Sequence, residues 1–335
     1  MPCSSVSVAP PGAVAAAPLT RLPLVTLYLT ERCNSRCMSC DYWRHGERDL
    51  DLTAVEQLLP GLAALGTQTV LLSGGEPLLH PQWAVIAARL RAQGLRLWLL
   101  TAGLALAKQA VEVARHVEQV TVSLDGATAA SYARIRGVDA FELVCKGVRA
   151  AVREGLPVTL RVTVQQGNAG ELPALVALAR ELGVAGISFL AADVAHHEAF
   201  GRRGAPLHPV ALRAEDLPVL AASLERIARE HADALASGFI AEPLAKLQRI
   251  EAHYRAQLGL GAPPPVRCNA PEHSAVIQAD GAVRPCFFIA GTGALEGGGL
   301  PAALAALPAR RLRADIAAGR RAECARCVCA KWFPA

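Results

Sequence analysis

The chain has few aromatic residues, very little methionine and no long apolar run. Phe, Trp and Tyr make up 4% of its 335 residues, although hydrophobic residues account for 52%. A core must therefore be built from Ala, Leu and Val, which suits helices of small residues packed on parallel strands. No apolar stretch reaches the roughly 18 residues that a membrane-spanning helix needs, and the start lacks the features of a signal peptide. We expect a cytoplasmic protein without a membrane partner.

The charge of the chain is modest, with a formal net value of +5. Basic residues are frequent near the C-terminus, at Arg310, Arg311, Arg313, Arg320, Arg321 and Arg326. A solvated helical face explains such a series, and a patch for an anionic substrate or partner is the alternative. Nothing in this pattern predicts a nucleic-acid partner.

Ten cysteines stand out against this background, and most of them are grouped. In a chain without a secretion signal, grouped cysteines indicate metal binding or redox chemistry rather than disulfides. The groups are Cys33, Cys37 and Cys40; Cys268 and Cys286; and Cys324, Cys327 and Cys329, while Cys3 and Cys145 are isolated. The isolated pair is interpreted as a tail thiol and a small buried residue.

Apolar runs that resemble strands alternate with stretches long enough for helices. The runs are Leu24–Leu29, Thr69–Leu72, Leu95–Leu100, Val117–Leu124, Val158–Val164 and Ile187–Leu190. Six such units in series predict a parallel sheet with right-handed crossovers. The expected fold class is therefore α/β, a partial (β/α)6 TIM-like barrel with a small cysteine-rich α+β extension at the C-terminus.

The predicted organisation has four parts. Residues 1–23 are a flexible N-terminal segment, 24–240 the barrel, 241–265 a helical linker and 266–335 the extension. Thr53–Glu56 has the pattern of a capping box at the start of the first crossover helix. In the extension, two short apolar runs around Asp280–Gly281 predict a β-hairpin.

The first cysteine group directly follows the first predicted strand, where a βα barrel presents its functional loops. Thiolates of Cys33, Cys37 and Cys40 can hold three irons of a [4Fe–4S] cluster and leave the fourth iron open to another ligand. A structural zinc site is the alternative, with His45 as the nearest fourth ligand.

This CX3CX2C spacing resembles the radical S-adenosylmethionine (SAM) superfamily. Gly74-Gly75-Glu76-Pro77 follows the second strand and is similar to the family's GGEP motif, which lines the amino group of SAM. The two glycines allow a close backbone approach, and Glu76 can accept hydrogen bonds from an ammonium.

The resemblance implies further SAM contacts at the ends of later strands. Ser123 and Asp125 match the segment near the ribose and carboxylate, Thr101 stands at another contacting turn, and Arg161 matches an arginine that pairs with the carboxylate. One departure is Ser39, where relatives commonly have an aromatic residue near the adenine. Tyr42 or Trp43 could substitute for it, or both could simply pack beneath the loop.

The later cysteines resemble the SPASM/twitch type of extension. That resemblance implies one auxiliary [4Fe–4S] cluster on Cys268, Cys286, Cys324 and Cys327, with Cys329 either an alternate ligand or unused. A zinc ribbon on the same four thiols is the other interpretation.

The implied reaction is reductive cleavage of SAM to a 5′-deoxyadenosyl radical, which abstracts hydrogen from a substrate. We expect net oxidation or rearrangement of a small polar metabolite or carbohydrate, with electrons from a flavodoxin- or ferredoxin-type reductant. A peptide-modifying maturase (RiPP type) is the first alternative, and a non-catalytic iron–sulfur carrier or sensor is the second. No catalytic acid or base is assigned, although the loop after the sixth strand offers His196, His197, Glu198 and His208.

Overall fold

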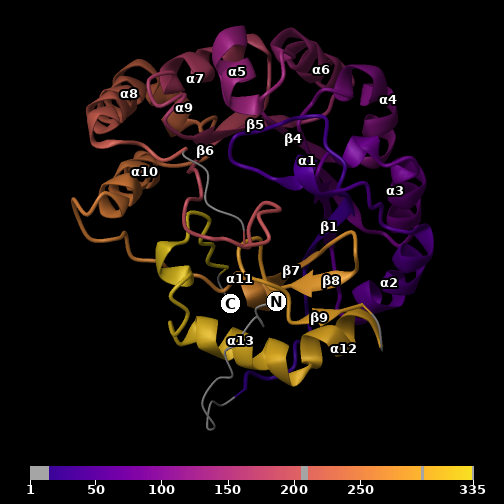
Figure 1. Ribbon diagram of the computed structural model, residues 1–335. Coiled ribbons are helices and arrows are strands. Elements are labelled where there is room, and N and C mark those ends of the chain that lie inside the picture. Colours follow the sequence, from indigo (N-terminus) through magenta and orange to yellow (C-terminus); the bar gives the residue numbers. More distant parts are fainter. Residues whose placement is uncertain (1–14, 205–209, 296–297, 334–335) are drawn as a thin grey trace.

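The computed structural model describes residues 15–204, 210–295 and 298–333 of the chain. The protein is built on one β-sheet with the strand order β6-β5-β4-β3-β2-β1-β7-β8-β9, and helices surround this sheet (Figure 1). The strands are β1 (Leu24–Thr30), β2 (Thr69–Gly74), β3 (Arg96–Thr101), β4 (Gln119–Ser123), β5 (Val158–Val164), β6 (Gly186–Ala191), β7 (Ser274–Ile277), β8 (Ala282–Arg284) and β9 (Gly293–Ala294). Strands β1 to β6 are parallel neighbours, which confirms the predicted partial α/β barrel.

Helices surround the sheet: most connect the parallel strands and cover their outer face, and the last two follow β9 (Figure 1). They are α1 (Tyr42–His45), α2 (Leu52–Ala64), α3 (Trp83–Ala92), α4 (Leu106–His116), α5 (Ala129–Arg136), α6 (Phe141–Arg153), α7 (Leu172–Glu181), α8 (Leu217–Glu230), α9 (Ala232–Ala236), α10 (Leu244–Gln257), α11 (Ala270–His273), α12 (Gly299–Ala305) and α13 (Leu307–Ala317), with short 3-10 turns at Pro77–Leu79, Ala214–Asp216 and Cys324–Arg326. Within the described ranges, none of them combines the length and apolarity that crossing a membrane requires.

The start of α2 differs from the predicted capping box at Thr53–Glu56. The helix begins at Leu52, and Asp51 is its N-cap, because the Asp51 carboxylate accepts a hydrogen bond from the Thr53 N–H at 2.7 Å. Asp is at least as good a cap as Thr, and Asp51, two positions before Thr53, was the better candidate.

The predicted hairpin around Asp280–Gly281 is present, and it extends the barrel sheet. Strands β7 and β8 pair antiparallel, while β7 lies parallel to β1 on the side opposite β2. Because β1 ends at the first cysteine loop, this pairing brings the C-terminal extension beside that loop. The last helices, α12 and α13, lie below the hairpin in Figure 1.

Strand β5 alternates between buried apolar residues and half-buried polar ones. The apolar set packs under the helices, and the polar set, which includes Arg161, occupies the other face. Pairing with β4 places Ser123 directly beside Arg161. Since successive strand residues point to opposite faces, these two side chains share the polar face of the sheet.

Candidate functional site

The loop after β1 carries the first cysteine group and is bonded to two other parts of the chain. Arg36 donates its backbone N–H to the Arg136 carbonyl at the end of α5, at 2.9 Å. Gly137 permits this approach, because its φ is +69° and a Cβ there would lie 2.3 Å from the Arg36 carbonyl oxygen. At the other end, Asp41 donates its N–H to the carbonyl of Phe200 at 2.8 Å. The cysteine loop is therefore held by α5 and by the loop after β6.

The three thiols of this loop lie in a poorly solvated place. Burial raises the pKa of Cys33 to about 11, raises that of Cys37, and raises that of Cys40 to about 12. Neighbouring thiols add to the increase at Cys33 and Cys40, whereas the Arg136 guanidinium opposes it at all three. Thiolates there need more positive charge than one arginine supplies, and coordinated metal ions provide it. The donor set therefore fits a cluster.

Gly74, which ends β2, and Gly75, which follows it, hold that strand against the start of the cysteine loop. Gly75 and Glu76 donate backbone hydrogen bonds to the carbonyls of Thr30 and Arg32, at 2.8 and 2.7 Å. A Cβ on Gly75 would lie 2.2 Å from the Arg32 carbonyl oxygen, and one on Gly74, which has a φ of +125°, would lie 2.5 Å from that of Thr30. Only glycine fits such contacts with backbone atoms.

The Glu76 carboxylate is fully buried and already has protein partners. It accepts hydrogen bonds from the Leu78 N–H at 3.1 Å, the Thr101 hydroxyl at 2.8 Å and the Ala102 N–H at 2.6 Å. Burial raises its pKa despite these bonds. Two carboxylate oxygens offer about four acceptor positions, so a further donor can still bind. Thr101 therefore supports Glu76, and Pro77 begins the turn that supplies one of the N–H donors.

Asp125 is engaged in a buried ion pair. Its carboxylate accepts the Thr163 N–H at 2.7 Å and contacts the Arg136 guanidinium at 3.1 Å. Burial raises the pKa of Asp125, and Arg136 opposes that increase. Arg136 also faces the thiols of Cys33 and Cys37, so Asp125 places a cation next to the cysteine loop. No sequence motif singled out Arg136.

Arg161 differs from Arg136 because no carboxylate among the described residues pairs with it, whereas Arg136 pairs with Asp125. The Nε atoms of both arginines are buried and have no hydrogen-bond partner among the described residues. An orphaned buried donor is costly unless a ligand accepts from it. The position beside Ser123 therefore fits the anionic end of a ligand, as the resemblance implied.

The aromatic residues of the cysteine loop pack against the protein. The ring of Tyr42 is 6% exposed and meets Tyr28 edge to face at 5.6 Å. Trp43 donates its indole N–H to the Cys40 carbonyl at 2.9 Å and lies under the guanidinium of Arg44. These contacts favour the packing interpretation over an adenine contact for Tyr42.

The structure also brings the later cysteines together. Burial raises the pKa of Cys286, of Cys324 to about 11 and of Cys327, and the thiol of Cys268 adds to the increase at each. Cys329 acts in the same way on Cys327. The thiols are therefore close enough to interact electrostatically, although they come from the segment before α11, the turn after β8 and the C-terminal tail.

A zinc ion and a [4Fe–4S] cluster require different arrangements of the same thiols. A zinc ion holds its thiolates about 2.3 Å away, which requires ligands gathered around one point. Within residues 15–204, 210–295 and 298–333, no group of three or more His, Cys, Asp or Glu side chains could hold a single metal ion. A [4Fe–4S] cluster distributes its thiolates over several irons. The side chain of His45, considered as a zinc ligand, lies outside the described part.

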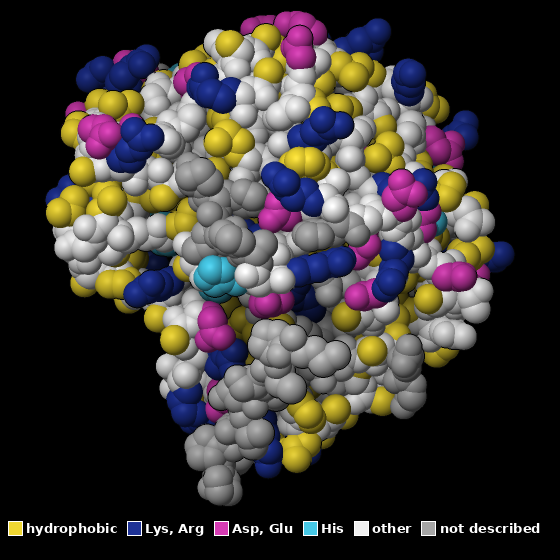
Figure 2. All heavy atoms as spheres, in the orientation of Figure 1, with side chains coloured by type: hydrophobic (Ala, Val, Ile, Leu, Met, Phe, Trp, Pro, Cys, Tyr) yellow, Lys and Arg dark blue, Asp and Glu magenta, His cyan; other side chains and the backbone are white. Residues whose placement is uncertain are grey.

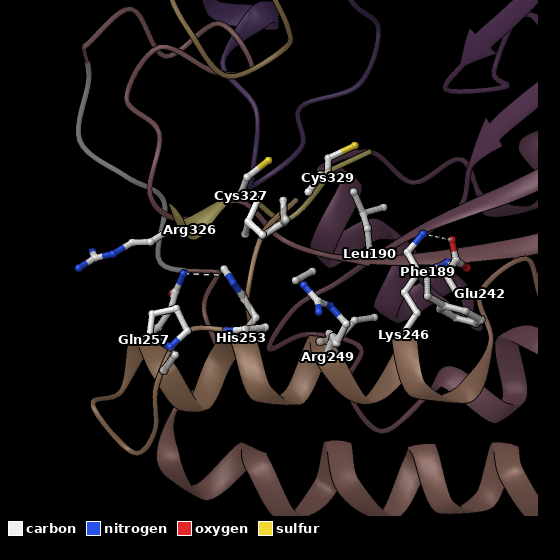
Figure 3. A pocket seen from close by; sticks show the side chains of 18 of the residues that line it. Phe189, Leu190, Glu242, Lys246, Arg249, His253, Gln257, Arg326, Cys327 and Cys329 are labelled. Carbon is white, nitrogen blue, oxygen red and sulfur yellow. Dashed lines mark hydrogen bonds and ion pairs between the residues drawn. The ribbon is translucent and has the colours of Figure 1, made fainter. Parts of the chain in front are cut away.

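A cavity of about 230 Å³ lies between the ends of β5 and β6, α10 and the C-terminal tail. Arg161 is part of its lining. Arg249 and His253 extend from α10 toward the tail, which contributes Cys327 and Cys329 on the opposite side (Figure 3). The cavity therefore connects the unpaired arginine of β5 with the later cysteine group.

A buried charge network, which the sequence did not predict, joins the two cysteine regions. Arg202 donates to the Asp193 carboxylate at 2.6 Å and to the Ser39 carbonyl at 3.4 Å. His196 bonds the other Asp193 oxygen at 2.5 Å and the Glu323 carbonyl at 2.9 Å. Both partners of the imidazole are acceptors, so both ring nitrogens donate and the ring is cationic.

The charge of His196 agrees with its surroundings and limits its chemistry. Burial alone would lower the pKa of His196, but the hydrogen bond and charge of Asp193 outweigh burial and raise it. Neither ring nitrogen is free for the acid–base role considered for this residue. His208, another candidate in the same loop, lies outside the described residues.

Comparison with known proteins agrees with this site. The family model described as the radical SAM superfamily matches residues 27–179. A probable GTP 3′,8-cyclase of Thermococcus kodakarensis is 34% identical over 212 residues, which are 60% of this chain and 67% of that protein. A PqqA peptide cyclase of Methylorubrum populi is 32% identical over 209 residues, 59% of this chain and 53% of the relative. The chain spans about half the length of most of the curated relatives it matches.

A solved structure shares the fold over most of the chain. Native anSMEcpe with bound AdoMet and the Cp18Cys peptide has a TM-score of 0.63 at 16% identity, and the match covers 86% of this chain and 81% of that one. The family match spans the cysteine loop, the Gly-Gly-Glu-Pro turn and β5, where the site was located. The chain belongs to the radical SAM superfamily, whose members are enzymes that use a [4Fe–4S] cluster and SAM.

Proposed function

We propose that this protein is a radical SAM enzyme that modifies a peptide. The observation that carries the proposal is the cavity beside Arg161, whose rim includes the exposed residues Lys246, Arg326 and Lys331. An open rim admits one residue of a long substrate while the rest remains outside. The similarity to PqqA peptide cyclase and to a peptide-bound anSMEcpe structure supports a peptide over the small polar metabolite or carbohydrate expected from the sequence.

In this proposal the polar ends of the parallel strands bind SAM. Cys33, Cys37 and Cys40 hold the cluster, and the SAM contacts are Gly74, Gly75, Glu76, Pro77, Thr101, Ser123 and Arg161. When bound, cluster and SAM together supply a 5′-deoxyadenosyl radical that abstracts hydrogen from the substrate. The protein orients the reacting atoms and excludes water.

The individual side chains divide this task according to their partners. Arg161 has a buried donor without a protein acceptor, so it receives the carboxylate of SAM. Thr101 fixes Glu76, whose remaining acceptor position faces the ammonium. Asp125 accepts hydrogen bonds from Arg136 and from the Thr163 N–H, so it positions Arg136 beside the cysteine loop. Like Glu76, it keeps acceptor positions that SAM can use.

For the later cysteines we propose one auxiliary [4Fe–4S] cluster held by Cys268, Cys286, Cys324 and Cys327, with Cys329 as an alternate ligand. A cluster with four cysteine ligands has no open iron, so it exchanges electrons with the substrate rather than binding it. Net oxidation is the expected outcome. A flavodoxin- or ferredoxin-type donor and the reducing cytoplasm would suit both clusters.

Peptide dependence tests the proposal. The anaerobically reconstituted protein is incubated with SAM, dithionite and synthetic copies of short peptides encoded beside its gene, and the peptides are analysed by mass spectrometry. We expect one peptide to change mass only when SAM is present, and no change with Cys33→Ala. Cys145→Ala, which removes a thiol from α6 outside both groups, is the matched control. Product from small alcohols or sugars, with every peptide unchanged, would contradict the proposal.

A further inference from the structure

Positive side chains dominate the cavity between β6, α10 and the tail. Its lining includes five cationic residues, Arg161, Lys246, Arg249, Arg326 and Lys331, and one carboxylate, Glu242. Figure 2 shows Lys and Arg side chains beside the notch that separates the barrel wall from the C-terminal extension. The local charge is therefore strongly positive in a protein whose overall charge is modest.

The single carboxylate of the cavity is already engaged. Glu242 accepts hydrogen bonds from the Ser188 hydroxyl at 2.7 Å and the Phe189 N–H at 2.8 Å, and its side chain is 7% exposed. Lys246 is 3.9 Å from the same carboxylate (Figure 3). Glu242 thus anchors α10 to β6 and offsets at most one of the cations.

The remaining cations have no carboxylate partners. In the part of the chain that the structure describes, Arg249, Arg326 and Lys331 form no ion pair, and Arg249 donates a hydrogen bond to the Pro265 carbonyl at 2.6 Å. Exposed arginines elsewhere do pair, as Arg226 does with Glu230 at 3.0 Å. Like charges that line one cavity repel each other, and a ligand of opposite charge removes that cost.

We propose that this cavity binds an acidic stretch of the peptide substrate. Arg249, which points into the cavity from α10, would meet a carboxylate inside it, and Lys246 would meet one at the rim (Figure 3). Arg326 extends away from the centre and would meet the part of the peptide outside (Figure 3), as would Lys331. This inference rests on the proposed function, because it names the class of peptide that the enzyme selects.

The neighbouring cysteines offer a competing explanation for the same charges. Cys327 and Cys329 also line the cavity, and cations there could offset the negative charge of thiolates bound to iron. In that case the cations would tune the auxiliary cluster and would not discriminate between peptides. Replacing the cations by carboxylates separates the two explanations. The first predicts a changed peptide preference, and the second predicts a changed cluster spectrum.

Binding of charge-matched peptides to the full-length, reconstituted protein separates them. Fluorescein-labelled peptides of equal length carry Glu, Gln or Lys at the same positions, and their binding in the presence of SAM is followed anaerobically by fluorescence anisotropy at low and high salt. The test variant is Lys246→Glu/Arg249→Glu. Arg255→Glu is the matched control, because Arg255 is on α10 and does not line the cavity. Iron content and the electron paramagnetic resonance spectrum are recorded for each protein.

We expect the Glu peptide to bind about tenfold more tightly than the Gln peptide, with a preference that decreases in high salt. The double variant should instead prefer the Lys peptide, and Arg255→Glu should behave like the wild type. Equal binding of Glu and Gln peptides would overturn the inference and leave the proposed function intact. An altered cluster spectrum with unchanged peptide preference would also overturn it. Failure of every peptide to bind would overturn the proposed function itself.

Discussion

Removal of the Arg202 guanidinium tests whether the buried network supports the fold around both cysteine groups. The side chains of Arg202 and Asp193 are each 1% exposed and meet at 2.6 Å. Arg202→Met keeps much of the side-chain volume but removes the donors to Asp193 and to the His196 carbonyl, the latter at 2.7 Å. Loss of one partner from a buried ion pair costs about 3–5 kcal/mol, because the remaining charge is uncompensated. His196 still pairs with Asp193, so we expect a loss of about 3 kcal/mol.

Urea unfolding of the cluster-free protein under anaerobic conditions, followed by circular dichroism, measures this loss. The double variant Asp193→Asn/Arg202→Met should lose less than the sum of the single variants, since it leaves no buried unpaired carboxylate. Arg226→Met removes the exposed ion pair between Arg226 and Glu230 on α8, and it should leave the free energy of unfolding unchanged. If Arg202→Met unfolds at the same urea concentration as the wild type, the network does not carry the role assigned to it.

Three further changes test other parts of the site. Gly75→Ala should lower the iron content after reconstitution, because its Cβ would lie 2.2 Å from the Arg32 carbonyl, whereas Gly261→Ala, with nothing within 4 Å, should retain it. Burial lowers the pKa of His253 to about 4, whereas the ring in the unfolded chain has a pKa of about 6.5. Between these pH values the unfolded state binds a proton that the folded state does not, so the free energy of unfolding decreases as the pH falls from about 6.5 toward 4. His253→Gln should lack that loss, about 3 kcal/mol, in urea unfolding at the two pH values; an equal loss in both proteins would contradict this. Cys329→Ser should retain the auxiliary-cluster spectrum if the other four thiols suffice, and loss of that spectrum would make Cys329 a ligand.

Much of the barrel could be predicted from the sequence because local patterns encode it. Strand β5 was predicted at its observed bounds, since its apolar residues recur at the period of a strand. The cysteine loop and the Gly-Gly-Glu-Pro turn each come at the end of a strand, and their residue patterns rarely serve another purpose at that position. The two glycines are explained by the close approach of the backbone, because a Cβ on Gly75 or Gly74 would lie 2.2 or 2.5 Å from a backbone oxygen.

The rest depended on contacts between segments that are distant in the sequence. Arg202 contacts Ser39 across 163 positions, and His196 contacts Glu323 across 127. Asp125 pairs with Arg136 of the following helix, and no spacing rule in the sequence connects these two residues. Likewise, the charged cavity combines α10 with the last residues of the chain, so its cations appear unrelated in the sequence.

Production of 5′-deoxyadenosine tests the central claim most directly. The full-length protein is reconstituted with iron and sulfide, reduced with dithionite and incubated anaerobically with SAM, and the product is measured by mass spectrometry for the wild type, Cys33→Ala and Cys145→Ala. The account predicts product from the wild type and Cys145→Ala and none from Cys33→Ala. Equal product from Cys33→Ala and the wild type, or none from a wild-type protein that carries its cluster and binds the peptide, would contradict it.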